Sequence, residues 1–199
     1  MTLNIHSDLK SIKKIHNLQS LNFLNNTKLK IAIIGGSFNP AHHGHLAISN
    51  YALNNLGFDY ALWLIAMQNP LKHRYDLDIF KRAQTAKITF NPKIIISTAE
   101  FDIIKHTKTT HTYNCLKFLI NRFSMVDFSW IIGKDNIYNF NKWYRYQDIV
   151  DLCKIIVLAR PGYNMCVNAS KFPIHSNITF YYDIKSDISS SQIKKNIIQ

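Results

Sequence analysis

The chain is poor in cysteine and has no long hydrophobic run. Its 3 cysteines, Cys115, Cys153 and Cys166, show no CxxC spacing, which argues against a disulfide framework or a zinc site. The longest apolar runs, such as residues 60–67, fall far short of the ~20 residues that span a bilayer. The N-terminus also lacks the apolar core of a signal peptide. These absences favour a soluble protein of the reducing cytoplasm with no membrane partner.

Acidic residues are scarce as well. The sequence has 12 Asp and Glu against 24 Lys and Arg, so its formal net charge is +12. Such a charge favours anionic partners, whether nucleic acid, anionic membrane or phosphorylated metabolites, and does not choose among them. Hydrophobic residues make up 47% and charged residues 18% of the 199 residues, the profile of one globular domain.

Short apolar runs alternate with amphipathic stretches from residue 29 onward. The pattern predicts strands over residues 30–34, 60–66, 93–97, 126–132 and 154–159, and helices over residues 43–56, 76–90 and 110–123, with another helical stretch after residue 132. Alternation of this kind predicts a single α/β domain with a doubly wound, Rossmann-like parallel sheet. Ligands of such sheets bind beyond the carboxyl ends of the strands, at the switch point of strand order. We expect this domain over residues 29–199, preceded by an N-terminal extension over residues 1–28.

The first predicted strand runs into a glycine pair. Gly35 and Gly36 are followed by Ser37 and Phe38, and the next helix opens on the sequence HHGH at residues 42–45. Glycine lets the backbone approach a ligand closely, and a helix N-terminus offers unpaired N–H groups to a phosphate. The common phosphate-binding patterns GxGxxG and GxxxxGK[ST] are both absent.

Two histidines, His42 and His45, are three residues apart and would share one face of the first helical turn. Imidazoles there could donate hydrogen bonds to a pentavalent phosphorus transition state and to departing pyrophosphate. A metal pair and ordinary capping or packing residues are the alternatives, although no third zinc ligand is evident.

Residues 35–45, GGSFNPAHHGH, resemble the signature of the HxGH nucleotidyltransferase superfamily, with His42, Gly44 and His45 in the motif positions. That superfamily has a second nucleotide-binding motif, ISSTxIR, which residues 188–194 match as ISSSQIK. Serines that open a helix cap it and leave N–H groups for a triphosphate, so the resemblance assigns ATP contacts to Ser189, Ser190 and Ser191.

The last residue of this second motif departs from the usual pattern. Lys194 keeps the charge of the usual Arg but loses its bidentate fork. Pantetheine-phosphate adenylyltransferases also have Lys at that place, so the C-terminal motif does not separate the two families.

The middle of the chain does separate them. Residues 131–146 are similar to the IIGxD…FxxWxxY stretch of nicotinate mononucleotide adenylyltransferases. This resemblance implies that Asp135 holds a ribose hydroxyl of ATP. It also implies that Trp143 stacks on a pyridine ring and that Tyr144 adjoins the acceptor.

Three further segments agree with that family. Lys72, in the place of its PxxxPxK loop, would meet the acceptor phosphate. Thr112 belongs to a stretch that lines the nicotinate pocket, where His111 and Asn114 replace the family's Tyr and Asp. Arg160 opens an RPGY turn after a strand and is also assigned to the acceptor.

The resemblance covers residues 30–199 and implies transfer of the AMP moiety of ATP to nicotinic acid mononucleotide. The products would be nicotinic acid adenine dinucleotide and pyrophosphate, a step of NAD biosynthesis. The acceptor phosphate would attack the α-phosphorus directly, while His42, His45, Lys194 and Mg²⁺ carried on the ATP phosphates position the groups and neutralise charge. No protein metal site is expected.

Two rivals remain open at this point, and an oligomer is possible. The nearer rival is a pantetheine-phosphate adenylyltransferase, of the same reaction type. The other is a basic RNA-binding module, suggested by the +12 charge and by the kinship of HxGH enzymes with class I aminoacyl-tRNA synthetases. RNP, KH and zinc-finger signatures are absent, so no nucleic-acid partner is expected.

Overall fold

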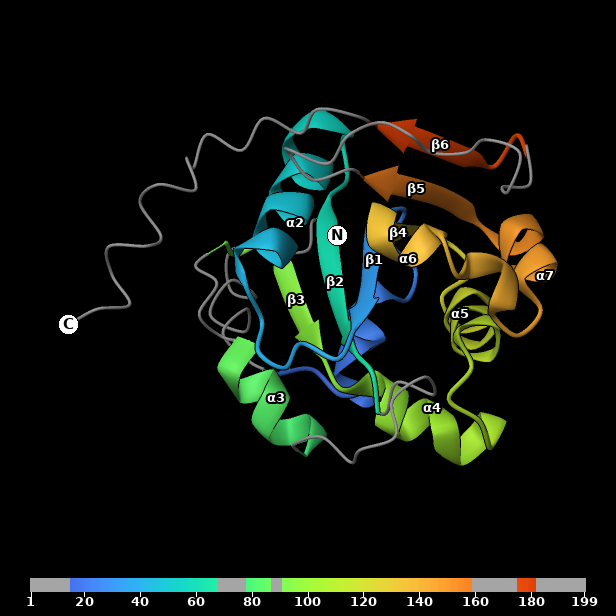
Figure 1. The fold of residues 1–199 in the computed structure, drawn as a ribbon. Coiled ribbons are helices and arrows are strands. Elements are labelled where there is room, and N and C mark those ends of the chain that lie inside the picture. Colours follow the sequence, from blue (N-terminus) through green and yellow to red (C-terminus); the bar gives the residue numbers. More distant parts are fainter. Residues whose placement is uncertain (1–14, 68–77, 87–90, 159–174, 182–199) are drawn as a thin grey trace.

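A computed structural model describes residues 15–67, 78–86, 91–158 and 175–181 (Figure 1). Within them, six strands form one sheet in the order β3-β2-β1-β4-β5-β6, and every neighbouring pair is parallel. The strands are β1 (Lys30–Gly36), β2 (Tyr60–Ile65), β3 (Ile94–Ser97), β4 (Asp127–Gly133), β5 (Lys154–Leu158) and β6 (Ile178–Tyr181). The predicted doubly wound parallel sheet is therefore confirmed. Its strand order reverses between β1 and β4, which is the switch point of the fold.

Helices cover both faces of the sheet (Figure 1). They are α2 (His43–Asn55), α3 (Ile79–Thr85), α4 (Ala99–Thr107), α5 (Thr112–Arg122), α6 (Lys134–Ile137) and α7 (Tyr146–Leu152), with 3-10 turns η2 (Gln19–Leu24) and η4 (Phe140–Lys142). The helices α2 and α3 pack with one core cluster, and α4, α5 and α7 pack with the other.

Strand β1 shows why its sequence is uniformly aliphatic. Ile31 and Ile33 point into the core cluster beneath α4, α5 and α7, whereas Ala32 and Ile34 point into the cluster beneath α2 and α3. All four side chains are buried. Because alternate side chains of a strand face opposite sides, a central parallel strand needs apolar residues at every position.

Most of the predicted elements are present with small shifts at their ends. The helix predicted over residues 110–123 begins at Thr112 and ends at Arg122. The helix predicted over residues 76–90 is seen as α3, and its outer residues 76–77 and 87–90 lie outside the described residues. Helix α4 and strand β6 were not predicted.

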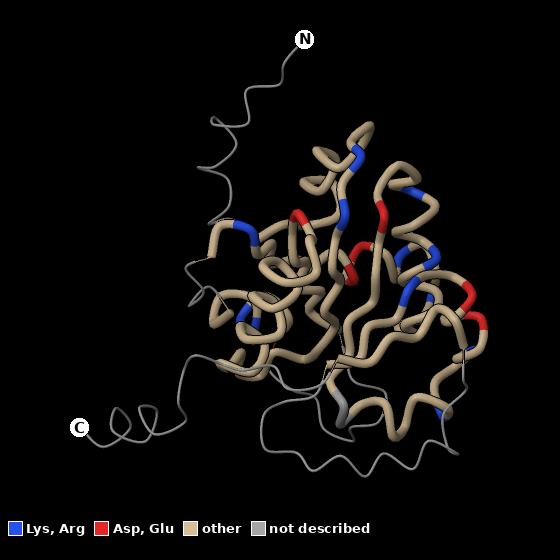
Figure 2. Tube along the Cα trace, turned by 90° about the horizontal axis from the view of Figure 1, so that it is seen from above, with Lys and Arg blue, Asp and Glu red and all other residues tan. Residues whose placement is uncertain are grey.

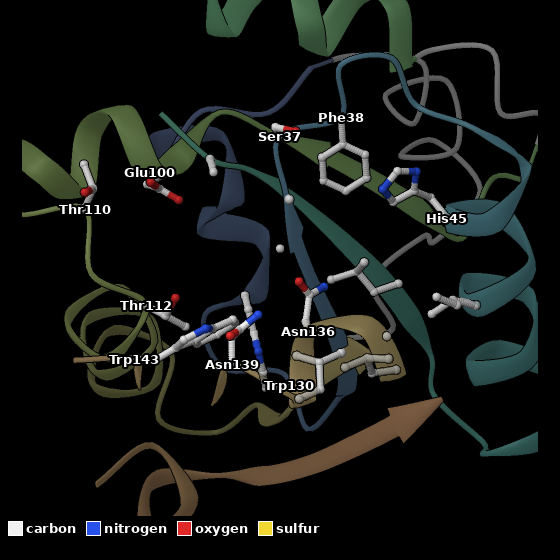
Figure 3. A pocket seen from close by; sticks show the side chains of 18 of the residues that line it. Ser37, Phe38, His45, Glu100, Thr110, Thr112, Trp130, Asn136, Asn139 and Trp143 are labelled. Carbon is white, nitrogen blue, oxygen red and sulfur yellow. The ribbon is translucent and has the colours of Figure 1, made fainter. Parts of the chain in front are cut away.

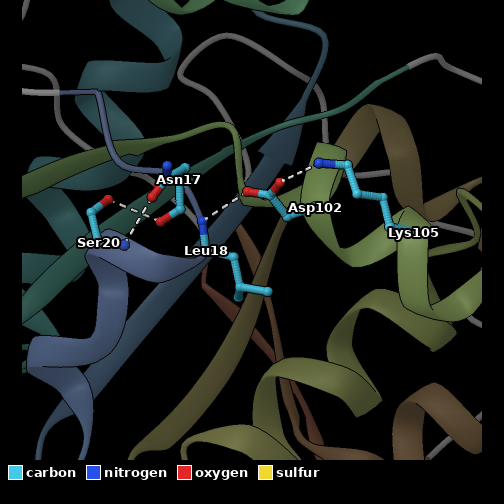
Figure 4. Close-up of polar contacts among 5 residues, drawn as sticks. All are labelled: Asn17, Leu18, Ser20, Asp102 and Lys105. Atoms are coloured by element: carbon cyan, nitrogen blue, oxygen red, sulfur yellow. Dashed lines mark hydrogen bonds and ion pairs between the residues drawn. The ribbon is translucent and has the colours of Figure 1, made fainter.

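The described part of the N-terminal segment packs on the same domain. His16 pairs with the end of β3: its N–H donates to the Ile96 carbonyl at 2.8 Å, and its carbonyl accepts from the N–H of Thr98 at 2.9 Å. The N–H of Leu18 donates to Asp102 on α4, which also pairs with Lys105 (Figure 4). The side chains of Leu18, Leu21 and Leu24 are buried in the core. Residues 16–24 thus pack against the core of the domain. The boundary expected at residue 28, between the N-terminal extension and the domain, stays a prediction.

Charged residues are spread along the described part of the chain. Lys and Arg lie on several elements, with Asp and Glu among them (Figure 2). Across the same residues, no helix has the length and apolar character needed to cross a membrane.

Candidate active site

A cavity of about 770 Å³ opens at the switch point of the sheet. Gly35 and Gly36 line it from the carboxyl end of β1, and Ile132 and Gly133 line it from the carboxyl end of β4. This is the place where doubly wound sheets bind their ligands. Its size suits a ligand of nucleotide dimensions.

The turn between β1 and α2 forms one end of this cavity. Phe38 is buried and has a φ of 47°, an unfavourable angle for a bulky residue, so the surrounding contacts must hold it in place. Its ring stacks on Trp63 at 4.9 Å between centroids and lies 4.5 Å from the His45 ring. The turn is therefore anchored in the core, while the backbone around Gly36 and Ser37 faces the cavity.

The two motif histidines form a reciprocal cap at the start of α2. The N–H of Gly44 donates to Nδ1 of His42 at 3.1 Å, and the N–H of His42 donates to Nδ1 of His45 at 3.2 Å. A ring nitrogen that accepts a hydrogen bond carries no proton, so this pattern assigns the proton of each neutral ring to Nε2. Each imidazole is thus held in the form whose Nε2–H can donate. Each histidine can both cap the helix through Nδ1 and donate to a phosphate through Nε2, so the two roles are compatible.

The opposite end of the cavity is aromatic. Trp143 follows η4, is half-buried and meets Phe140 edge to face at 5.4 Å between centroids. Tyr144 is half exposed and stacks on His111 at 4.4 Å. Trp143, Tyr144 and His111 line a wall suited to a flat ring, together with Thr112 at the first position of α5. Thr112 and Trp143 are labelled in Figure 3.

A buried carboxyl that the sequence analysis missed lies on the cavity wall. Glu100, in the first turn of α4, is 7% exposed, and its Oε1 accepts from the N–H of Met67 at 3.1 Å. Burial raises the pKa of Glu100 to about 7, against the opposing influence of the Met67 hydrogen bond and the Arg82 charge.

Arg82 joins this carboxyl to the turn after β1. The residue is 2% exposed, and its guanidinium donates to the carbonyl oxygens of Ser37 at 2.6 Å and Met67 at 3.0 Å. Arg82 therefore links the loop that follows β1 to the loop that follows β2. An Arg in the middle of a short amphipathic helix carries no sequence signal for such a role.

Most predicted residues within the described part of the chain gather at this cavity. Those that line it are Gly35, Gly36, Ser37, Phe38, His42, His45, Thr112, Trp143 and Tyr144. Gly44 contributes its N–H to the histidine cap. Asp135 belongs to α6, just past β4, but its side chain is outside the description. Outside the described residues altogether lie Lys72, Arg160, Ser189, Ser190, Ser191 and Lys194.

Other cavity residues were not predicted. Polar ones among them are Thr110, Asn136, Asn139 and Lys142, besides Glu100. Asn136, Asn139 and Lys142 fall inside residues 131–146, the stretch that resembles the nicotinate mononucleotide enzymes, so that stretch was the available signal for them. Among the described residues, no group of three His, Cys, Asp or Glu side chains could hold a metal ion.

Comparisons with known proteins show the family to which this chain belongs. The Cytidylyltransferase-like family model matches residues 33–196. A probable nicotinate-nucleotide adenylyltransferase of Pelagibacter ubique is 33% identical over 177 residues, 87% of this chain and 97% of the relative. A protein of the same name from Parvibaculum lavamentivorans is 39% identical over 139 residues, 69% of this chain and 67% of the relative.

Solved structures share the fold. The nicotinic acid mononucleotide adenylyltransferase of Plasmodium falciparum, complexed with NaAD, superposes with a TM-score of 0.63 at 21% identity and covers 84% of this chain and 83% of its own. A putative nicotinate-nucleotide adenylyltransferase from Vibrio parahaemolyticus gives a TM-score of 0.52 at 20% identity, covering 67% of this chain and 75% of its own. At these identities the likeness shows the fold alone. The family model and the curated relatives show more: this chain is a nucleotidyltransferase and belongs to the nicotinate-nucleotide adenylyltransferase family.

Proposed function

We propose that the protein transfers the adenylyl group of ATP to nicotinic acid mononucleotide, giving nicotinic acid adenine dinucleotide and pyrophosphate. The observation that carries the proposal is a single cavity with a phosphate-suited turn at one end and an aromatic wall at the other. A pyridine mononucleotide has its phosphate and its flat ring at opposite ends, so it matches both. Phosphopantetheine has no ring to meet Trp143 and Tyr144, which disfavours the rival acceptor.

In this reaction an oxygen of the acceptor phosphate attacks the α-phosphorus of ATP, and the bond to pyrophosphate breaks. The acceptor phosphate is already a nucleophile, so the enzyme needs no general base. We assign His42 and His45 to donate from Nε2 to the charge that develops on the α-phosphate and on the leaving pyrophosphate. Their caps support this role, because a fixed tautomer needs no reorganisation during the reaction.

The remaining assignments follow from the family resemblance. Lys194, with Ser189, Ser190 and Ser191, would hold the triphosphate, and Asp135 a ribose hydroxyl of ATP. Lys72 and Arg160 would meet the acceptor. ATP enters as its Mg²⁺ complex, in which phosphate oxygens and water are the ligands and the ion neutralises charge. The N–H groups of the phosphate end suit that arrangement, since an N–H donor pairs with a phosphate oxygen and cannot ligate a cation.

The acid form of the mononucleotide should be the better acceptor. N–H groups of the first turn of α5, around Thr112, and the backbone near Tyr144 are donors that a carboxylate can accept from. An amide N–H₂ would leave such donors unpaired. A cytoplasmic location is part of the proposal, and it is supported by Cys115 and Cys153, which are both free thiols.

One experiment tests this function against its rivals. The purified protein receives ATP and Mg²⁺ with nicotinic acid mononucleotide, nicotinamide mononucleotide or phosphopantetheine in parallel, and pyrophosphate release is measured. We expect the acid mononucleotide to be preferred over the amide by at least about tenfold in kcat/KM. Faster turnover of phosphopantetheine would favour the rival enzyme. RNA binding that weakens with salt, without ATP turnover, would favour the RNA-binding module.

A further inference from the structure

Glu100 is a buried carboxyl that faces the cavity between its two ends. Figure 3 shows its side chain on the wall between Ser37, at the phosphate end, and Thr112 and Trp143, at the aromatic end. The residue is 7% exposed. A carboxyl at such a depth carries a desolvation cost, so it needs partners.

The partners of Glu100 use only part of the hydrogen-bond acceptor capacity of its carboxyl group. Oε1 accepts from the N–H of Met67 at 3.1 Å, and Arg82 supplies a nearby positive charge. No other described residue donates a hydrogen bond to Glu100. An ionised carboxylate accepts at two oxygens and about four lone-pair sites. The carboxyl therefore has acceptor capacity left where it faces the cavity.

The chemistry of a mononucleotide identifies the group that can use this capacity. The acceptor phosphate and the nicotinate carboxylate are both anions, and a carboxylate at Glu100 would repel either of them. The ribose between them carries two neighbouring hydroxyls, which are neutral donors. Because Glu100 lies between the two ends of the cavity, the ribose is the part of the acceptor that reaches it.

We propose that the Glu100 carboxylate accepts hydrogen bonds from the ribose hydroxyls of the acceptor mononucleotide and so selects nucleotides over other phosphorylated acceptors. This inference rests on the proposed function. Arg82 supports the binding form of Glu100, because its guanidinium offsets the negative charge and holds the Met67 loop against the same carboxyl. The hydroxyls replace the water that the carboxylate loses on burial.

The test compares Glu100→Gln with the wild-type enzyme on three acceptors: nicotinic acid mononucleotide and its 2′-deoxy and 3′-deoxy analogues. Gln keeps the size of the side chain and one carbonyl oxygen for the N–H of Met67. We expect the wild type to disfavour at least one deoxy analogue by about tenfold or more in kcat/KM, as for a lost hydrogen bond to a charged group. In Glu100→Gln this discrimination should fall to about twofold or less, while KM for ATP stays unchanged. Calorimetric affinities of the same acceptors in the absence of ATP should follow the same pattern.

Asp102→Asn is the matched control, a carboxyl-to-amide change on the same helix at a side chain that does not line the cavity. It should keep the wild-type discrimination. If Glu100→Gln impairs the intact and deoxy acceptors by one common factor, Glu100 only supports the Met67 loop and the proposal is overturned. A wild type that accepts the deoxy analogues as well as the intact mononucleotide also overturns it, and leaves the proposed function standing. Failure of the wild type to use nicotinic acid mononucleotide at all would overturn both.

Discussion

The indole of Trp130 lies directly against Gly35. A methyl group on Gly35 would overlap Cη2 of Trp130 and stand 2.9 Å from its Cζ2. Gly35 is near the carboxyl end of β1, and Trp130 is on the neighbouring strand β4. The glycine is therefore required by packing at the switch point.

Gly35→Ala should destabilise the protein by about 1–3 kcal/mol, the usual cost of inserting a group into a packed core. Urea unfolding measures the change. The double variant Gly35→Ala/Trp130→Leu should lose less than the sum of the two single variants, because Leu vacates the space that the new methyl needs. Additive losses would show that the contact with Trp130 is not the reason for the glycine.

His45→Ala should fold normally and lose at least about a hundredfold in turnover, since a donor aimed at transition-state charge typically contributes that much. His43→Ala is the matched control, because His43 is exposed at the start of the same helix and does not line the cavity. Steady-state kinetics measure the turnover of both variants, and circular dichroism checks that both are folded. Wild-type turnover in a folded His45→Ala enzyme would remove this histidine from the reaction.

The turn after β1 and the start of α2 could be predicted because their signals are local. An aliphatic run, a glycine pair and a capping sequence lie within residues 30–45, and each fixes its own backbone. Helix α4 was missed because no glycine marks its C-terminal end. It ends at Thr107, and the capping residue Lys108 adopts a left-handed φ of 59°, a conformation for which glycine is the usual sequence signal.

Strand β6 and the buried carboxyl were missed for a different reason. Strand β6 (Ile178–Tyr181) lies at the edge of the sheet and its side chains are partly buried or exposed, so its sequence, ITFY, is not the uniformly aliphatic run of a central strand. The position of Glu100 depends on Met67 and Arg82, which the fold brings to it from other elements. The spacing of residues along the sequence does not reveal tertiary contacts of this kind.

The stability of the protein should carry a pH dependence that belongs to Glu100. Its pKa is about 7 in the folded protein, against an ordinary value of 4.5, because burial disfavours the charged form. Between these two values the folded state holds a proton that the unfolded state has released. The free energy of unfolding therefore falls as pH rises through this window, by up to about 3 kcal/mol from this group alone.

Subtracting the unfolding free energies of Glu100→Gln from those of the wild type, between about pH 4 and pH 8, isolates this contribution from other carboxyls. The groups that face Glu100 are the Arg82 guanidinium on α3, the Cys115 thiol on α5 and the N–H of Met67 after β2. Asp148 provides the opposite case, because Arg145 lowers its pKa and its contribution is lost only in acid. A difference that stays flat across the window would mean that Glu100 titrates as an ordinary carboxyl.

Trp143→Ala should raise KM for the mononucleotide about five- to tenfold and leave KM for ATP nearly unchanged, because the ring contact belongs to one substrate only. The stacking face is the same for a pyridine that bears a carboxylate or an amide. The variant should therefore harm both mononucleotides alike and keep the preference for the acid, which depends on N–H donors near Thr112 and Tyr144. Tyr138→Ala, at an exposed aromatic residue outside the cavity, is the control and should change neither KM.

An equal rise in KM for ATP and for the mononucleotide would mean that Trp143 holds the loop after β4 rather than the ring. Loss of the acid preference in Trp143→Ala would instead place the discriminating contact on the indole itself.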